Sequence, residues 1–353
     1  MTRDPGRPLG IGLVGTGIGR LHAEGIARMP ETARLAAVCA RQLADARRFA
    51  AEHGAASATD DYEEMLRDPG VEAVDLCVPH NLHLPMALAA AAAGKHILVE
   101  KPIARTLEEA DRIIAAARAA GVTLMVGHNQ RFFGHHAKAR ELITAGVIGK
   151  PFMVVATVHV HGQIDTGFRR FLEQAGGGTL IDSGVHRFDL LRWLMGDVES
   201  VYAHTGRFMQ QQMEGEDCAV VALRFRSGAI GSFSCSWSAR TPFPNETLEI
   251  FGPRGAILTE DHGRTLRLKT DAPPPGLADA RELHFAVDQA ESIRRVIGGF
   301  ADCVDRGVPP PITGEDGRAA LELTMASYRS AATGLPVKLP DRQPEGLRQR
   351  SAS

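Results

Sequence analysis

The feature that most constrains the fold is a glycine-rich turn between an apolar strand and a helix. The strand is predicted at 9–14, and the run Gly15-Thr16-Gly17-Ile18-Gly19 follows it and opens a helical stretch that ends before Pro30. In this setting glycines allow a tight turn and let a pyrophosphate approach the backbone at the helix N-terminus. The turn therefore predicts that Gly15, Thr16, Gly17, Ile18 and Gly19 hold a dinucleotide.

Apolar strands alternate with helical segments through the first 130 residues. The strands are predicted at 9–14, 34–39, 74–78, 96–99 and 123–126, with a helix or a helix-length connection between neighbours. This alternation is typical of a parallel sheet that is covered on both faces through right-handed crossovers. We therefore expect an α/β protein whose residues 1–130 form a doubly wound Rossmann domain.

The pattern changes over residues 131–340. The segment 152–161 alternates, and Val154, Ala156, Val158 and Val160 would share one face. Further strands are predicted at 201–205, 218–224, 230–237 and 247–251, and helices at 185–195 and 315–330. These elements indicate a second, α+β domain with a large, mostly antiparallel sheet that keeps one open face. Residues 341–353 are expected to form a polar tail.

Composition excludes several classes of function. The chain has 353 residues with 40 Lys and Arg against 42 Asp and Glu, so it has no broad positive field for nucleic acid or an anionic membrane. No apolar run approaches the ~20 residues of a membrane helix. The five cysteines form no CxxC pair, which is typical of free thiols. We expect a cytoplasmic protein without nucleic-acid or membrane partners.

The end of the second strand bears on the choice of dinucleotide. It reads Val38-Cys39-Ala40-Arg41, without the acidic residue that would bind the adenine ribose of NAD. Ala40 and Arg41 are therefore predicted to contact the cofactor, with Arg41 pairing with the 2′-phosphate of NADP. NADP is the preferred prediction and NAD stays possible, because Arg41 could equally be an ordinary solvated side chain.

Two loops at later strand ends carry candidate chemistry. Ligands of doubly wound sheets lie beyond the carboxyl ends of the strands, where Pro79, Asn81 and His83 end one strand and Glu100 and Lys101 end the next. These five residues are predicted to contact the cofactor. The chain contains only six Lys among its 40 basic residues. A Lys at this position suggests a group that can release a proton beside a cationic nicotinamide, which Arg cannot do.

A second constellation follows three consecutive glycines at 176–178. Asp182 and His186 are four residues apart and Asp189 is seven from Asp182, so a helix beginning at Asp182 would place all three on one face. A carboxylate one turn away would orient His186 and favour its imidazolium form. We expect His186 to be the principal acid/base, Asp182 to orient His186 or the substrate, and Asp189 to be structural. The alternative is a helix cap beside a buried histidine.

These separated motifs resemble the glucose-fructose oxidoreductase, inositol dehydrogenase and rhizopine-catabolism (Gfo/Idh/MocA) family from about Leu9 to Pro340. The resemblance implies redox chemistry on a secondary alcohol or ketone of a sugar, cyclitol or related polyol, with NAD or NADP. It implies that Lys101, Asp182 and His186 are catalytic. It also implies a homodimer or homotetramer through the open sheet. His22 falls one residue earlier than the usual histidine of the family, because the glycine turn is one residue shorter.

The resemblance also suggests substrate contacts and leaves alternatives. Arg131 and Arg169 match positions near the family's substrate, and Gln163, Asp165 and Thr166 could read hydroxyl groups. No metal is expected, because the pairs His135-His136 and His159/His161 lack further ligands at suitable spacing. The alternatives are an enzyme for a non-sugar carbonyl or diol, and a non-catalytic cofactor-sensing regulator on the same fold.

Overall fold

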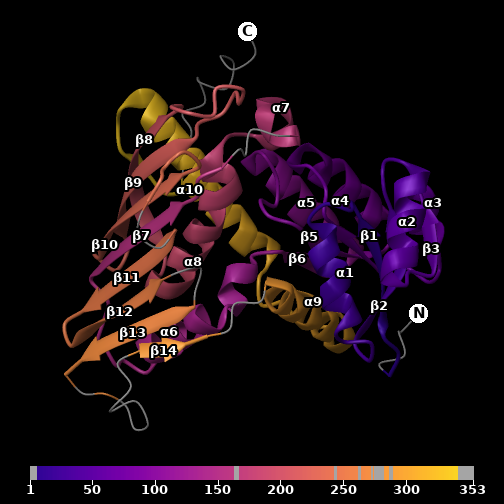
Figure 1. Cartoon of the computed structure of the whole chain (residues 1–353), viewed down its shortest axis with the longest axis horizontal. Helices are drawn as coiled ribbons and strands as arrows, with labels where there is room; N and C mark the ends of the chain where they lie inside the picture. Colours follow the sequence, from indigo (N-terminus) through magenta and orange to yellow (C-terminus); the bar gives the residue numbers. More distant parts are fainter. Residues whose placement is uncertain are drawn as a thin grey trace.

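The chain folds around two β-sheets that lie side by side, each with helices packed against it (Figure 1). The computed structural model describes residues 6–162, 167–241, 245–260, 264–271, 273, 282–285 and 289–340. The predicted hydroxyl-reading residues Gln163, Asp165 and Thr166, and the predicted polar tail 341–353, lie outside these residues.

The first sheet contains six parallel strands within the described residues, and it confirms the predicted Rossmann architecture. The strands are β1 (Leu9–Val14), β2 (Ala33–Cys39), β3 (Ser57–Thr59), β4 (Ala73–Leu76), β5 (His96–Val99) and β6 (Leu124–Val126). Their order is β3-β2-β1-β4-β5-β6, so the direction of strand progression reverses at β1. That reversal is the position where doubly wound sheets bind their ligands.

Helices connect these strands and cover the sheet. They are α1 (Gly19–Ala27), α2 (Leu43–His53), α3 (Tyr62–Arg67), α4 (His83–Ala92) and α5 (Leu107–Ala120). The Thr106 hydroxyl accepts a hydrogen bond from the Glu109 amide and caps the start of α5, as its sequence spacing predicts. The interior of the sheet is fully apolar at β1, where every residue is buried. This core fixes the carboxyl ends of the strands that carry the predicted site.

The second sheet is mixed and mostly antiparallel, with nine strands in the described part of the chain. Its strands are β7 (Met153–His159), β8 (Val198–Gly206), β9 (Cys218–Phe225), β10 (Ile230–Ser236), β11 (Glu246–Gly252), β12 (Gly255–Glu260), β13 (Thr265–Thr270), β14 (Glu282–His284) and β15 (Val337–Lys338). The order is β14-β13-β12-β11-β7-β10-β9-β8-β15, and only β7 and β10 pair in parallel among the described strands. Val154, Ala156 and Val158 are buried on one face, as their alternation predicts.

The remaining helices lie mainly between the two sheets (Figure 1). They are α6 (Gly134–Thr144), α7 (Leu172–Ala175), α8 (Val185–Met195), α9 (Gln289–Arg306) and α10 (Gly314–Thr333). Thr313 forms a capping box with Asp316 at the start of α10. Helix α9 crosses to the first sheet and packs on α1, where a side chain at Gly25 would meet the Arg294 backbone. None of the helices in the described ranges combines the length and apolarity needed to cross a bilayer.

Candidate active site

A cavity of about 860 Å³ lies at the carboxyl ends of the first sheet and reaches the start of α8. This volume is in the range of about 300–1,000 Å³ that is usual for ligand sites. The sequence-predicted residues that line the cavity are Gly15, Thr16, Gly17, Ile18, Ala40, Arg41, Pro79, Glu100, Lys101, Arg169, Asp182 and His186. Residues predicted from separate motifs therefore meet at one concave surface.

The glycine turn has the geometry that a dinucleotide requires. Gly15 has a φ of +96°, and a Cβ there would lie 2.2 Å from the carbonyl oxygen of Cys77, so only glycine fits. A Cβ at Gly17 would meet nothing within 4 Å, which leaves open space above the backbone at the start of α1. Gly19 does not line the cavity; its Cα packs toward Leu13 and provides the close helix–strand contact. The turn thus fits a pyrophosphate, with Gly19 acting through packing.

The segments after β2 and β3 and the start of α2 place both basic and acidic side chains beside the cavity. Arg41 lines it, as do Asp45 and Asp60. The Asp45 carboxylate accepts a hydrogen bond from the Arg48 guanidinium at 2.5 Å, which partly neutralises its charge. One guanidinium and two carboxylates therefore lie at the same end of the cavity.

Lys101 and Asp182 join the two halves of the chain inside the cavity. The Lys101 Nζ lies 2.9 Å from the Asp182 carbonyl oxygen and 3.5 Å from its Oδ1. Arg169 Nε donates to Asp182 Oδ2 at 3.2 Å. Burial alone would raise the pKa of Asp182, but the charges of Lys101 and Arg169 outweigh it and lower that pKa. Asp182 is thus an ionised acceptor between two cations.

His186 lines the same cavity, but its electrostatics differ from the sequence prediction. Asp182 was expected to favour the imidazolium form of His186. Instead, burial and the positive charge of Lys101 lower the pKa of His186 well below its usual value, although Asp182 acts in the opposite sense. No hydrogen bond joins His186 to Asp182 in the described structure, where Asp182 binds Lys101 and Arg169. His186 is therefore a neutral imidazole at neutral pH.

Besides Gly19, three predicted contact residues do not line the cavity. Asn81 is not among the residues that line it, and the ring nitrogens of His83 lie within 3.0 Å of the carbonyl oxygens of Pro102 and Val78. His83 therefore ties the β4 and β5 loops together. Arg131 binds Asp189 through both guanidinium ends, at 2.8 and 2.5 Å. This buried pair gives Arg131 and Asp189 a structural position instead of a place on the cavity wall.

The three glycines before Asp182 serve packing within the protein. A Cβ at Gly177 would lie 2.2 Å from the Tyr328 hydroxyl, and one at Gly178 would lie 1.8 Å from the Glu216 carbonyl oxygen. Neither glycine lines the cavity, so both make room for neighbouring groups of the protein. The Glu216 carboxylate accepts hydrogen bonds from the amides of Gly178 and Leu180. It fixes the π-helical turn Leu180–Gly184 that carries Asp182 into the cavity.

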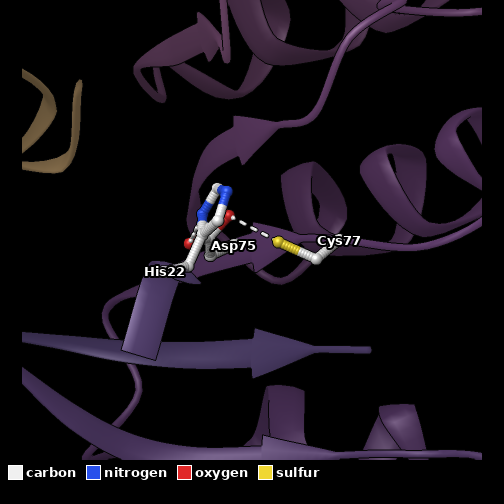
Figure 2. Close-up of side chains that lie close together, drawn as sticks. All are labelled: His22, Asp75 and Cys77. Atoms are coloured by element: carbon white, nitrogen blue, oxygen red, sulfur yellow. Dashed lines mark hydrogen bonds and ion pairs between the residues drawn. The ribbon is translucent and has the colours of Figure 1, made fainter. Parts of the chain in front are cut away.

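A buried polar cluster lies beneath the glycine turn. Figure 2 shows His22 beside Asp75 and Cys77, on α1 and at the end of β4. The His22 Nδ1 lies 2.7 Å from Asp75 Oδ2 and its Nε2 lies 3.2 Å from Glu100 Oε1. Burial opposes protonation, but Asp75 outweighs it and the pKa of His22 is raised well above its usual value. The cluster is an internally bonded ion network that links α1 to the residue before Lys101.

His80 and Glu246 are among the cavity residues that sequence reasoning missed. His80 was passed over in favour of its neighbours Pro79, Asn81 and His83, although all follow the same strand. Glu246, the first residue of β11, binds the buried Arg187 at 2.8 Å. Alternation could have placed Glu246 on a strand, but no local signal reveals which end of β11 faces the cavity.

Comparison with known proteins identifies the family. Residues 9–128 match the family model described as "Oxidoreductase family, NAD-binding Rossmann fold", and residues 136–258 match the "GFO/IDH/MocA C-terminal domain". The chain belongs to the Gfo/Idh/MocA oxidoreductases. The resemblance drawn from the separated motifs is therefore confirmed, and the protein is an NAD-binding oxidoreductase.

Relatives of this Gfo/Idh/MocA oxidoreductase extend over almost the whole chain. It is 33% identical to myo-inositol 2-dehydrogenase of Thermotoga maritima over 94% of this chain and 98% of that protein. It is 32% identical to 1,5-anhydro-D-fructose reductase of Ensifer adhaerens over 82% of this chain and 86% of that protein. The structure of levoglucosan dehydrogenase with NADH and levoglucosan superposes with a TM-score of 0.87 at 25% identity, covering 95% of this chain and all of that one.

Proposed function

We propose that this oxidoreductase interconverts a secondary alcohol and a ketone of a sugar, cyclitol or related polyol. The observation that carries the proposal is the meeting of Lys101, Asp182 and His186 on the cavity that begins at the glycine turn. A bound nicotinamide dinucleotide supplies hydride acceptance and donation. The names of the relatives, which act on inositols and anhydrosugars, support a polyhydroxylated substrate.

The three side chains have different tasks in this proposal. Lys101 donates a hydrogen bond to the reacting oxygen and holds the carbinol carbon in place. His186, kept neutral by burial and by Lys101, takes the hydroxyl proton during oxidation and returns it during reduction. Asp182 remains ionised, fixes the ammonium of Lys101, and accepts a hydrogen bond from the substrate. Arg169 holds the second oxygen of Asp182 and lies at the substrate end of the cavity.

A spectrophotometric assay tests the function. Purified protein is incubated with NADP⁺ or NAD⁺ and, separately, with myo-inositol, scyllo-inositol, D-glucose and levoglucosan. We expect at least one polyol to produce the absorbance of reduced nicotinamide, because the cavity joins the cofactor turn to proton-transfer groups. If cofactor binds but a broad polyol panel, in both reaction directions, gives no turnover, the proposal is wrong and a cofactor-sensing role becomes the better interpretation.

We further propose NADP as the preferred cofactor. Arg41 lines the cavity directly after β2, and Asp45 at the same end already binds Arg48. An arginine can pair with the 2′-phosphate, whereas a carboxylate at the end of β2 would repel it. NAD remains a cofactor for the same turn, since the pyrophosphate contacts do not depend on the 2′ position.

We also propose a homodimer or homotetramer in the cytoplasm. The outward face of the second sheet exposes Val220 and Ile230 to 57% and 50%, with Tyr202 at 36% on neighbouring β8. Apolar side chains gathered on an open sheet face favour association with a second copy. All five cysteines are free thiols, which fits a reducing compartment.

A further inference from the structure

His80 lines the cavity in a fixed position, but the roles proposed for Lys101, Asp182 and His186 give it no task. It begins a 3₁₀ turn (His80–Leu82) after β4 and is 4% exposed, yet it lines the cavity beside Asp182. Its ring packs edge-on against Phe168, with centroids 5.0 Å apart. The ring therefore has one defined orientation between the two halves of the chain.

The hydrogen bond at one ring nitrogen determines what the other can do. The Nδ1 of His80 lies 2.7 Å from the carbonyl oxygen of Ala175 at the end of α7. A carbonyl only accepts, so Nδ1 carries the proton and donates it. Burial lowers the pKa of His80 to about 3, so the ring is neutral at physiological pH. Its Nε2 therefore bears a lone pair and is an acceptor.

That lone pair faces a second acceptor. The Nε2 of His80 lies 3.7 Å from Asp182 Oδ1, and the carboxylate is ionised. Neither atom has a proton to donate, so no hydrogen bond can form between them. Lys101 Nζ is 3.5 Å from the same Oδ1, so this oxygen lies between one donor, the ammonium of Lys101, and one acceptor, the Nε2 of His80.

We propose that His80 is a specificity residue that reads a hydroxyl group adjacent to the reacting carbinol. This inference rests on the proposed function. With the reacting oxygen at Lys101 and its proton passed to His186, the hydroxyl on the next carbon donates to His80 Nε2, since Asp182 Oδ1 already faces the Lys101 ammonium at 3.5 Å. A lone alcohol has no such hydroxyl and leaves the buried Nε2 of His80 unpaired in a desolvated site. The substrate class favoured by this arrangement is therefore a vicinal diol within a polyol.

Two substitutions separate this role from a purely structural one. In His80→Asn, the side-chain amide can still donate to Ala175 from the position of Nδ1, but the acceptor at Nε2 is lost. In His80→Gln, the longer amide can place an acceptor oxygen near the position of Nε2. His284→Asn, at an exposed position on β14, is the matched control.

The experiment measures kcat/KM for trans-cyclohexane-1,2-diol and cyclohexanol, with myo-inositol as the polyol reference. We expect wild type and His284→Asn to prefer the diol. In His80→Asn this preference should fall about 5- to 100-fold while cyclohexanol turnover is unchanged, and His80→Gln should recover part of it. A diol preference that is unchanged in His80→Asn overturns this inference but not the proposed function. Absence of wild-type turnover with these probes and with the polyol panel overturns the proposed function and this inference together.

Discussion

At the scale of single residues, the site depends on which partner each charged group finds. Asp182 binds Lys101 and Arg169, and this leaves His186 without the carboxylate that its sequence spacing suggests. His186 is consequently neutral, which suits a base that must accept a proton during alcohol oxidation. Arg131 was expected near the substrate, but it binds Asp189 and does not line the cavity.

Arg41 gives a prediction at this scale. We expect Arg41→Ala to lower kcat/KM with NADP by about 10- to 100-fold, the effect of losing a charge-assisted hydrogen bond, and to leave the value with NAD nearly unchanged. Steady-state kinetics with both cofactors measure the ratio. Arg20→Ala, an exposed arginine paired with Glu52, is the matched control. Two results would show that Arg41 does not bind the 2′-phosphate. One is a higher kcat/KM with NAD than with NADP in the wild type, and the other is an equal fall of kcat/KM with both cofactors in Arg41→Ala.

At the scale of elements, local sequence signals predict the first sheet and the main helices well. The spacing of apolar residues and caps indicates β1, β2 and the helix now described as α8, whose residues 185–195 agree with the prediction. These elements are encoded by neighbours in the chain. Sequence reasoning therefore succeeds where periodicity and capping decide the structure.

Other elements and contacts could not be predicted because distant segments decide them. Strand β14 is three residues long, and α9 packs on α1, far away in sequence. The run 176–178 looks suited to a ligand, but its glycines make room for Tyr328 and Glu216 from later elements. The cavity lining of His80 likewise depends on α7, which only the folded chain brings beside β4.

At the scale of the whole molecule, one sheet provides the cofactor turn, and the other has an open face through which we propose that two copies associate. We expect wild type to sediment as a dimer or tetramer at micromolar concentration. A double variant, Val220→Lys with Ile230→Lys, should sediment as a monomer, because lysines on the open face oppose burial against a second copy. Circular dichroism checks that the variant stays folded. A monomeric wild type, or an unchanged oligomer in the variant, would contradict association through this face.

Lys101 from the first half of the chain and His186 from the second line the same cavity. The most direct test of whether they act on one alcohol is turnover after each is replaced separately. We predict that Lys101→Met and His186→Asn each lower kcat about 10²- to 10⁴-fold on a polyol that wild type oxidises, while the dissociation constant for NADPH changes little. Lys138→Met, at a half-buried position on α6 where Lys138 pairs with Glu141, should behave as wild type. Near-normal turnover in Lys101→Met and His186→Asn, with cofactor bound, would show that these side chains do not act on one alcohol.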